Sequence, residues 1–429
     1  MSPRRPDGLL VPALAWVALA VLLVLAQQGW AGGAWRPVVV AAMFAAFAVG
    51  ARAVAELPQR RALRAAVLGG LGLQLIALRV RPWSTDDYLR YVWDGRVLLS
   101  GVNPYRYPPG DAALAGLRDQ WLFPDGVTPA LNHPTARTIY PPVAQYFFAA
   151  VEALPGGDGQ GRVLQVCFAV IAVLTTLLLV RACRAAGIDP RRVVWWAWCP
   201  TVILEAGGNA HIDTLAALLL VAAMLAATKE RWLASGVLIG LATGTKLTPA
   251  LAGLALPPRA WLRAGGAAVL VLALSYLPFL LGGVDVTGYL LGYADEESRD
   301  RWDLLRPLLP DAIVPVVGMA LLIGLIAAVA SSRLRSLTRA PERAAAIVGG
   351  TWLLLTPAYP WYFLPLVALV GLGASRVWLL PGAAAYLVYA AAALGQSYTL
   401  TRVIGYGLAA VMVIGTLAAA ERRARRDCR

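Results

Sequence analysis

The chain has 429 residues, of which 59% are hydrophobic and only 14% charged, and its mean hydropathy is +0.64. A soluble enzyme carries about 25% charged residues, so the composition argues against a soluble globular protein and predicts a polytopic membrane protein. The net charge of +14 is almost entirely arginine. Its basic residues cluster between apolar runs, which is typical of the positive-inside rule and argues against nucleic-acid binding.

Five apolar runs reach the roughly 20 residues that a helix needs to cross a bilayer. Shorter apolar runs lie between them. We therefore expect a single all-α transmembrane domain over residues 1–429, with about 12 transmembrane helices and one re-entrant pair of half-helices. The five clearest runs cover residues 8–27, 36–56, 162–181, 260–282 and 402–420.

The arginines predict how the chain is oriented in the membrane. Arg4 and Arg5 precede the first run and place the N-terminus in the cytoplasm. The basic tail, residues 421–429, is expected on the same side, against anionic lipid. The alternation of runs then places segments 81–141 and 283–304 outside the cell, and these are the main external features expected.

The re-entrant pair is predicted from residues 232–258, "WLASGVLIGLATGTKLTPALAGLALPP". The segment must leave and return to the cytoplasmic side over a length too short for two full spans, so two half-helices should meet near Lys246 and Pro249. Broken helices at membrane depth occur where they line a polar cavity. Lys246 would then meet a phosphate; the alternative is a lysine that snorkels from a helix end.

Segment 81–109, "RPWSTDDYLRYVWDGRVLLSGVNPYRYPP", places two adjacent acids directly after an apolar run. A helix is expected over residues 85–100. In a purely structural interpretation, Ser84 and Asp87 form a capping box, with Asp86 and Asp87 in the first turn. A cap needs one acid, however, and capping does not explain the other polar motifs of this segment.

In the functional interpretation, a carboxylate at the membrane surface takes a proton from an acceptor hydroxyl as it attacks. If the donor is a lipid-linked phosphosugar, its phosphate is already a good leaving group. One base and a few cations then suffice, whereas a glycoside hydrolase needs two carboxylates.

The stretch "EAGGNAHIDTLAALL", residues 205–219, adds further polar groups at the expected outer boundary. Asn209 and Asp213 are four residues apart and would share a helix face. His211 is one of two histidines in the chain. Ionisable residues within a membrane usually face a functional cavity; the alternative is an interfacial helix start that Asn209 caps.

Two further motifs have both a structural and a functional interpretation. In "TPAYPWYFLP", Tyr359, Trp361 and Tyr362 are either part of an interfacial aromatic belt or a wall for the sugar or the isoprenoid. His133, in "NHPTARTIYPP", is expected to fix its loop rather than to catalyse, and it forms no zinc site without more ligands.

At these motifs the chain resembles the bacterial polyprenyl-phosphate-mannose-dependent mannosyltransferases of the GT-C glycosyltransferase superfamily. The resemblance spans residues 84–365. It rests, in the family's order, on "DDYLRYVWDGRVLLSGVNPY", "NHPTARTIYPP", "EAGGNAHID", "GLATGTKLTP" and "TPAYPWYFLP". The acid pair of the first motif is the most specific feature.

The resemblance implies a polyprenyl-phosphate sugar donor, a glycolipid or glycan acceptor, and inversion at the anomeric carbon. Asp87 would be the base, with Asp86 second. Lys246 and His211 would hold the donor phosphate. No cofactor is certain; the acid pair leaves a divalent metal open. The remaining residues expected at the substrate are Asp94, Arg96, Asn103, Tyr105, His133, Tyr140, Asn209, Asp213, Tyr359, Trp361 and Tyr362.

The main alternative is a transporter or a flippase for lipid-linked sugars, which broken helices and buried charges would also suit. Such proteins are usually built from paired repeats, and this sequence has no internal repeat. A related transferase that uses another sugar is a further alternative, because a few hydroxyl contacts decide the sugar.

Overall fold

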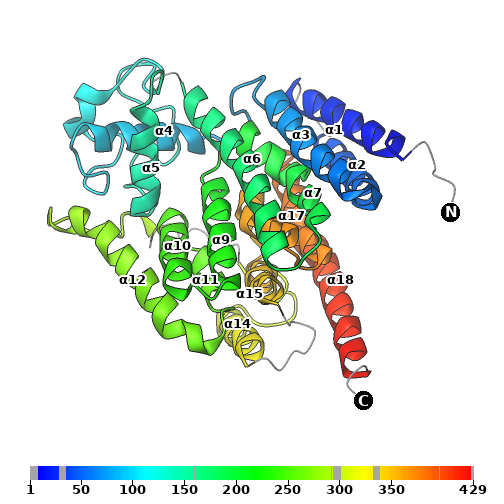
Figure 1. Cartoon of the computed structure of the whole chain (residues 1–429). Coiled ribbons are helices and arrows are strands. Elements are labelled where there is room, and N and C mark those ends of the chain that lie inside the picture. Colours follow the sequence, from blue (N-terminus) through cyan, green and yellow to red (C-terminus); the bar gives the residue numbers. More distant parts are fainter. Residues whose placement is uncertain are drawn as a thin grey trace.

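The computed structural model describes residues 8–28, 35–157, 160–290, 292, 301–331, 339–395 and 397–426. All regular secondary structure in these ranges is helical, which confirms the expected all-α class (Figure 1). Arg4, Arg5, residues 293–300 of the second expected external segment, and residues 427–429 of the tail lie outside the described residues.

Five of the described helices are long and apolar enough to cross a membrane, and they coincide with the five predicted runs. The prediction of a polytopic membrane protein is thus confirmed. The predicted count of about 12 spans is not confirmed, because the other apolar helices among the described residues are shorter or interrupted. The five are α1 (Leu10–Gln28), α2 (Arg36–Glu56), α6 (Arg162–Ala185), α12 (Pro258–Leu280) and α18 (Tyr398–Arg426).

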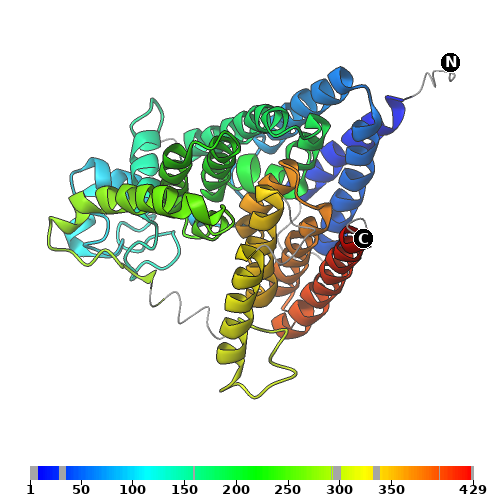
Figure 2. The same cartoon turned by 60° about the horizontal axis from the view of Figure 1, so that its bottom comes forward.

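The segment that follows α3 (Gln59–Ala77) forms a small helical unit of its own. It contains α4 (Asp87–Leu99), the short η1 (Ala112–Leu117) and α5 (Pro142–Glu152). Gly95 allows α4 and α5 to pack closely, since a Cβ atom there would lie 2.6 Å from the carbonyl oxygen of Phe148. The unit lies on the opposite side of the molecule from α1, α2 and α3 (Figure 1 and Figure 2).

The predicted helix over residues 85–100 is confirmed, but its predicted capping box is wrong. α4 begins at Asp87, and Asp86, in the N-cap position, makes no side-chain capping bond. Instead the Asp87 amide donates to Oγ1 of Thr85 (3.2 Å). The carboxylates are therefore free to face away from the helix end.

The crossing after α6 is a broken helix. It runs through η2 (Pro190–Val193), α7 (Val194–Ala197), α8 (Pro200–Val202) and the π-helical η3 (Ile203–Gly208) before α9 (Asp213–Thr228) begins. Buried amide side chains satisfy the freed backbone groups. Gln74 accepts from the Gly207 amide (2.9 Å), and Gln165 donates to the Gly207 carbonyl (2.8 Å).

The predicted helix break near Lys246 and Pro249 is present, between two helices of unequal length. α10 (Trp232–Thr245) and α11 (Pro249–Gly253) are joined by the link that carries Lys246. The later part of the chain forms α14 (Val314–Ala330), α15 (Ala340–Leu355), η4 (Pro360–Phe363), α16 (Leu364–Gly371), η5 (Arg376–Leu379) and α17 (Leu380–Ala393).

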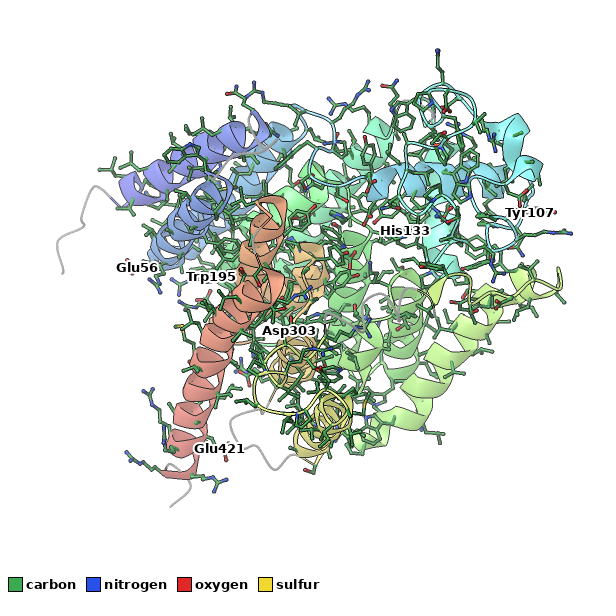
Figure 3. All side chains as sticks on the ribbon, turned by 180° about the vertical axis from the view of Figure 1, so that it is seen from behind. Glu56, Tyr107, His133, Trp195, Asp303 and Glu421 are labelled. Carbon is green, nitrogen blue, oxygen red and sulfur yellow. The ribbon has the colours of Figure 1, made fainter. Side chains whose placement is uncertain are left out.

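The basic turns lie at the end of the helices away from the α4–α5 unit. Arg191 donates to the Leu57 carbonyl in the turn between α2 and α3 (3.3 Å), and Arg192 donates to the Ala374 carbonyl before η5 (2.5 Å). Glu421, near the end of α18, is well separated from His133 in the α4–α5 unit (Figure 3).

Candidate active site

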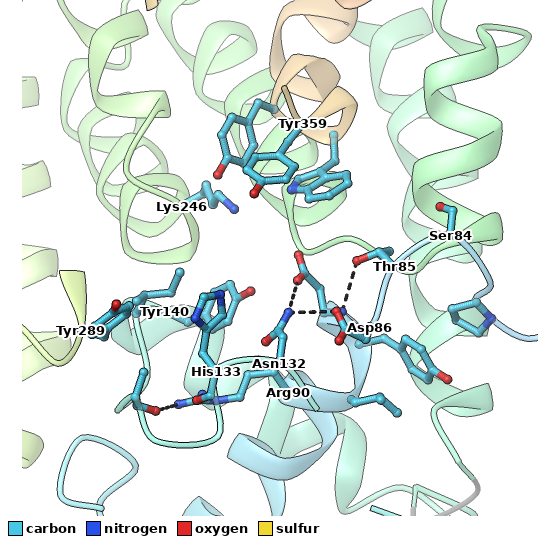
Figure 4. A pocket seen from close by; sticks show the side chains of 18 of the residues that line it. Ser84, Thr85, Asp86, Arg90, Asn132, His133, Tyr140, Lys246, Tyr289 and Tyr359 are labelled. Carbon is cyan, nitrogen blue, oxygen red and sulfur yellow. Dashed lines mark hydrogen bonds between the residues drawn. The ribbon is translucent and has the colours of Figure 1, made fainter. Parts of the chain in front are cut away.

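A polar cavity of about 560 Å³ lies between the α4–α5 unit and the helical core (Figure 4). Residues from widely separated parts of the chain meet there. Eight of the predicted site residues line it: Asp86, Asp87, His133, Tyr140, Lys246, Tyr359, Trp361 and Tyr362.

The two acids share one amide group. The Nδ2 atom of Asn132 donates to Oδ1 of Asp86 (3.0 Å) and to Oδ1 of Asp87 (2.9 Å). Burial raises the pKa of Asp86, and the negative charge of Asp87 raises it further. The Asp86 carboxyl therefore keeps its proton to a higher pH than a solvent-exposed aspartate does.

The acid pair does not fit a divalent cation in this arrangement. A cation needs oxygen ligands directed at one point, but the donor group of Asn132 lies between the facing oxygens of Asp86 and Asp87. Among the described residues, no group of three or more His, Cys, Asp or Glu side chains is placed to hold a metal ion.

Lys246 faces the acids from the opposite wall of the cavity (Figure 4). Its Nζ atom lies 3.4 Å from Oδ2 of Asp213 and 4.8 Å from the ring centre of Tyr362. The Lys246 side chain is 17% exposed, and that of Asp213 is 1% exposed. Lys246 is therefore an ion-paired lysine at a cavity wall, which disagrees with the snorkelling alternative.

A second cavity, of about 330 Å³, adjoins the first. Ile139, Tyr140, Lys246 and Tyr362 line both cavities. The rest of the second cavity is mostly apolar, with Arg301 as a further cation. Its other lining residues are Pro141, Leu247, Thr248, Leu290, Trp352, Leu355 and Pro357.

Three predicted residues of the "GGNAHID" stretch, Asn209, His211 and Asp213, are buried behind the cavity wall and do not line the cavity. His211 is fully buried and stacks on Trp361, with ring centres 3.9 Å apart. The prediction that Asn209 and Asp213 share a helix face is wrong, because η3 ends at Gly208 and α9 starts only at Asp213. Asn209 accepts from the amides of Trp83 and Ser84 (3.4 and 3.3 Å) and so ties the start of the external segment to the core.

The structure does not bring four other predicted residues into the cavity. Asp94 is buried and accepts from Arg90 (2.9 Å), Thr138 (2.6 Å) and Gln145 (3.1 Å). This network holds the polypeptide of residues 132–140 against α4. The other three also make contacts within the fold: Arg96 with Asp119, Asn103 with the Phe279 carbonyl, and Tyr105 with the Tyr140 carbonyl.

The sequence analysis missed several residues of the site. Asn132 precedes His133 in a motif that had been noted, so its position was a usable signal. Tyr289, in a turn, and Tyr389, in α17, also line the cavity, but neither lies in a motif that the sequence analysis had noted. Glu205 was quoted but given no role; it lies 2.9 Å from Nδ1 of His211.

The model of glycosyltransferase family 87 matches residues 138–357, just over half of the chain. The chain belongs to glycosyltransferase family 87. The matched residues of this family-87 chain include Lys246, His211 and the π-helical break, and they begin after the loop that carries Asp86 and Asp87.

A curated relative is similar to part of this family-87 chain. It is the polyprenol-phosphate-mannose-dependent alpha-(1-2)-phosphatidylinositol pentamannoside mannosyltransferase of Mycolicibacterium smegmatis, 33% identical over 162 residues. The match covers 36% of this chain and 38% of the relative's own length. The resemblance to polyprenyl-phosphate-mannose-dependent mannosyltransferases is thereby confirmed. No solved structure matches significantly.

Proposed function

We propose that this chain transfers a sugar, mannose, from a polyprenyl-phosphate donor to a glycolipid acceptor at the outer face of the membrane. The observation that carries the proposal is the junction of a polar and an apolar cavity at Lys246. A polyprenyl-phosphate sugar has the same order of parts: a polar sugar, a phosphate and an apolar chain.

The donor is proposed to lie across this junction. Its phosphate would contact the ammonium of Lys246, with Arg301 as a further cation, and its isoprenoid units would fill the apolar cavity. The sugar would then lie in the polar cavity against Tyr359, Trp361 and Tyr362, because aromatic faces pack well on the C–H faces of a sugar ring.

The transfer itself needs one base. The acceptor oxygen attacks the anomeric carbon on the face opposite the phosphate, while the bond from that carbon to the phosphate oxygen breaks. The phosphate leaves with the bonding electrons, and the hydroxyl proton moves to Asp87. Because this is a single displacement, a β-linked donor gives an α-linked product, which agrees with the linkage in the name of the mycobacterial relative.

Asp87 is favoured over Asp86 as the base. Its Oδ1 atom accepts from Asn132 (2.9 Å), and the second oxygen is turned toward His211. Asp86, whose pKa is raised by burial and by the charge of Asp87, is the second candidate. We assign the external catalytic loop to residues 81–141, which carry both acids and Asn132.

The outward orientation is supported by charge. Arg191, Arg192 and Arg376 lie in turns at the end of the helices opposite the polar cavity. By the positive-inside rule this end would be cytoplasmic, together with the basic residues of the tail. Membership of a glycosyltransferase family favours this proposal over a transporter or flippase.

The test uses purified protein in lipid with radiolabelled polyprenyl-phosphate-mannose and a lipid acceptor fraction, with wild type beside Asp87→Asn. We expect label in the acceptor with wild type alone. Parallel reactions with other polyprenyl-phosphate sugars identify the sugar. Absence of transfer from every donor by folded wild-type protein would contradict the proposal.

A further inference from the structure

A row of buried polar groups runs from Asp87 into the helical core. The Nε2 atom of His211 lies 3.8 Å from Oδ2 of Asp87, and Nδ1 lies 2.9 Å from Oε2 of Glu205. The hydroxyl of Tyr386 donates to the other oxygen of Glu205. The imidazole therefore lies between two carboxylates and does not line the cavity.

The imidazole is held firmly in this position. Its ring stacks on Trp361 at an interplanar angle of 13°. Ala210, directly before it, has φ of 63°, a left-handed conformation that residues other than glycine rarely adopt. The His211 amide donates to the Glu205 carbonyl (2.8 Å). The surrounding fold thus compensates backbone strain at the residue that places this side chain.

Two acidic side chains flank the ring of His211. Two carboxylates face it directly, that of Glu205 from η3 and that of Asp87 from α4. Within the described part of the chain, neither forms an ion pair with a lysine or arginine. A buried carboxylate is costly without a cationic partner, and an imidazolium would serve both.

The other charged groups near His211 either form ion pairs with each other or lie farther from the imidazole ring. Lys246, from the link between α10 and α11, pairs with Asp213 at the start of α9. Arg90 of α4 pairs with Asp94. Asp86 shares Asn132 with Asp87, and His133 lies with Asp86 on the cavity wall. The phenols of Tyr91, Tyr140 and Tyr386 supply no positive charge.

We propose that His211 is a positioning residue for the transfer: an imidazolium held between Glu205 and Asp87 that keeps the Asp87 carboxylate ionised and directed into the cavity. This inference rests on the proposed role of Asp87 as the base. It replaces the phosphate contact that the family resemblance implied for His211, since the ring is shielded from the cavity by its stack on Trp361.

The charge state is testable without any substrate. The chain has two histidines, so magic-angle-spinning NMR of protein labelled with ¹⁵N-histidine in bilayers gives two ring systems, which His211→Phe assigns. At pH 7 we expect both ring nitrogens of His211 to be protonated in wild type, and one to lose its proton at lower pH in Glu205→Gln. A neutral His211 ring in wild type at pH 7 would overturn the proposal.

Kinetics then test the role in transfer. His211→Phe keeps a ring to stack on Trp361 but removes the charge. We expect kcat to fall about 10²-fold with little change in donor KM. The acid limb of the kcat/KM profile should move to higher pH, because Asp87 loses a neighbouring cation. Glu205→Gln should move the limb in the same direction.

The outcomes separate this inference from the proposed function. An unshifted acid limb, or a raised donor KM with unchanged kcat, would overturn the positioning role while transfer by wild type stands. Failure of wild type to transfer from any polyprenyl-phosphate sugar would remove the proposed function and the role of His211 in it; the NMR arm would still report whether the imidazolium exists. The unchanged His133 signal reports that each variant is folded.

Discussion

The ammonium of Lys246 lies 3.4 Å from the carboxylate of Asp213, whose side chain is almost fully buried beneath the cavity wall. The pair joins the link between α10 and α11 to the start of α9. Lys246 therefore has two partners in the proposed enzyme, a permanent one in the fold and a transient one in the donor phosphate.

Removing Lys246 should affect both stability and donor binding. Lys246→Met leaves Asp213 as a buried charge without its partner, which costs about 3–5 kcal/mol. The double variant Lys246→Met with Asp213→Asn should recover most of that stability, because the buried carboxylate is gone, yet keep a raised donor KM. Thermal unfolding and donor titrations measure the two effects. Wild-type donor KM in the double variant would contradict the phosphate role.

Asp87→Asn should abolish transfer while leaving the protein folded in the membrane. An amide cannot take the acceptor proton, and loss of a general base typically lowers the rate about 10²–10⁴-fold. The neighbouring bond from Asn132 can be kept through the Asn oxygen, so little structural change is expected. Turnover and the thermal unfolding midpoint are measured together; near wild-type turnover would rule out Asp87 as the base.

Asp86→Asn should give an active enzyme with a changed pH profile. Removing the adjacent negative charge makes Asp87 easier to ionise, so the acid limb of kcat/KM should move to lower pH. Complete loss of activity would instead identify Asp86 as the base.

The same variant should be more stable than wild type at neutral pH. Because the folded state raises the pKa of Asp86, proton binding stabilises the fold at low pH, and this contribution is lost as the pH rises through the folded-state value. The stability difference between Asp86→Asn and wild type should therefore shrink on acidification. Unfolding midpoints at pH 4 and pH 7.5 measure it; a difference independent of pH would contradict this assignment.

Leu355→Trp should fill the apolar cavity. We expect a raised KM for donors with a long isoprenoid chain and little change for a short-chain analogue, because only the former needs the space. Leu262→Trp is a matched control, since Leu262 is 88% exposed on α12. Equal effects on both donors would show that the chain lies elsewhere.

The orientation can be tested by cysteine labelling in a background without the four native cysteines. Val127, in the proposed external loop, is 67% exposed. It is a better site than Asp125, whose carboxylate accepts from two turn amides. Val127→Cys should react with an impermeant reagent in intact cells, and Arg184→Cys, at the opposite end, only after lysis. The reverse pattern would invert the topology.

Features with a local cause were predictable from the sequence. The length of the apolar runs predicted the five long helices. The segment around Lys246, too short for two full spans, predicted the helix break there. Asp94 shows where this reasoning stops: it lies on the same helix as Asp87, but Thr138 and Gln145 cover it, and no local pattern predicts which face a distant loop will cover. The π-helical turn before Asn209 likewise depends on Gln74 and Gln165 from other helices.

The shared wall of Tyr140, Lys246 and Tyr362 between the two cavities has a consequence for substrate choice. In the proposed donor pose it would mark the depth at which the isoprenoid chain ends and the sugar begins. A protein built this way would recognise the phosphate that joins the isoprenoid chain to the sugar, rather than either end of the donor. Chain length on the lipid side and glycan size on the water side would then vary freely, so one fold can serve acceptors that differ greatly in size.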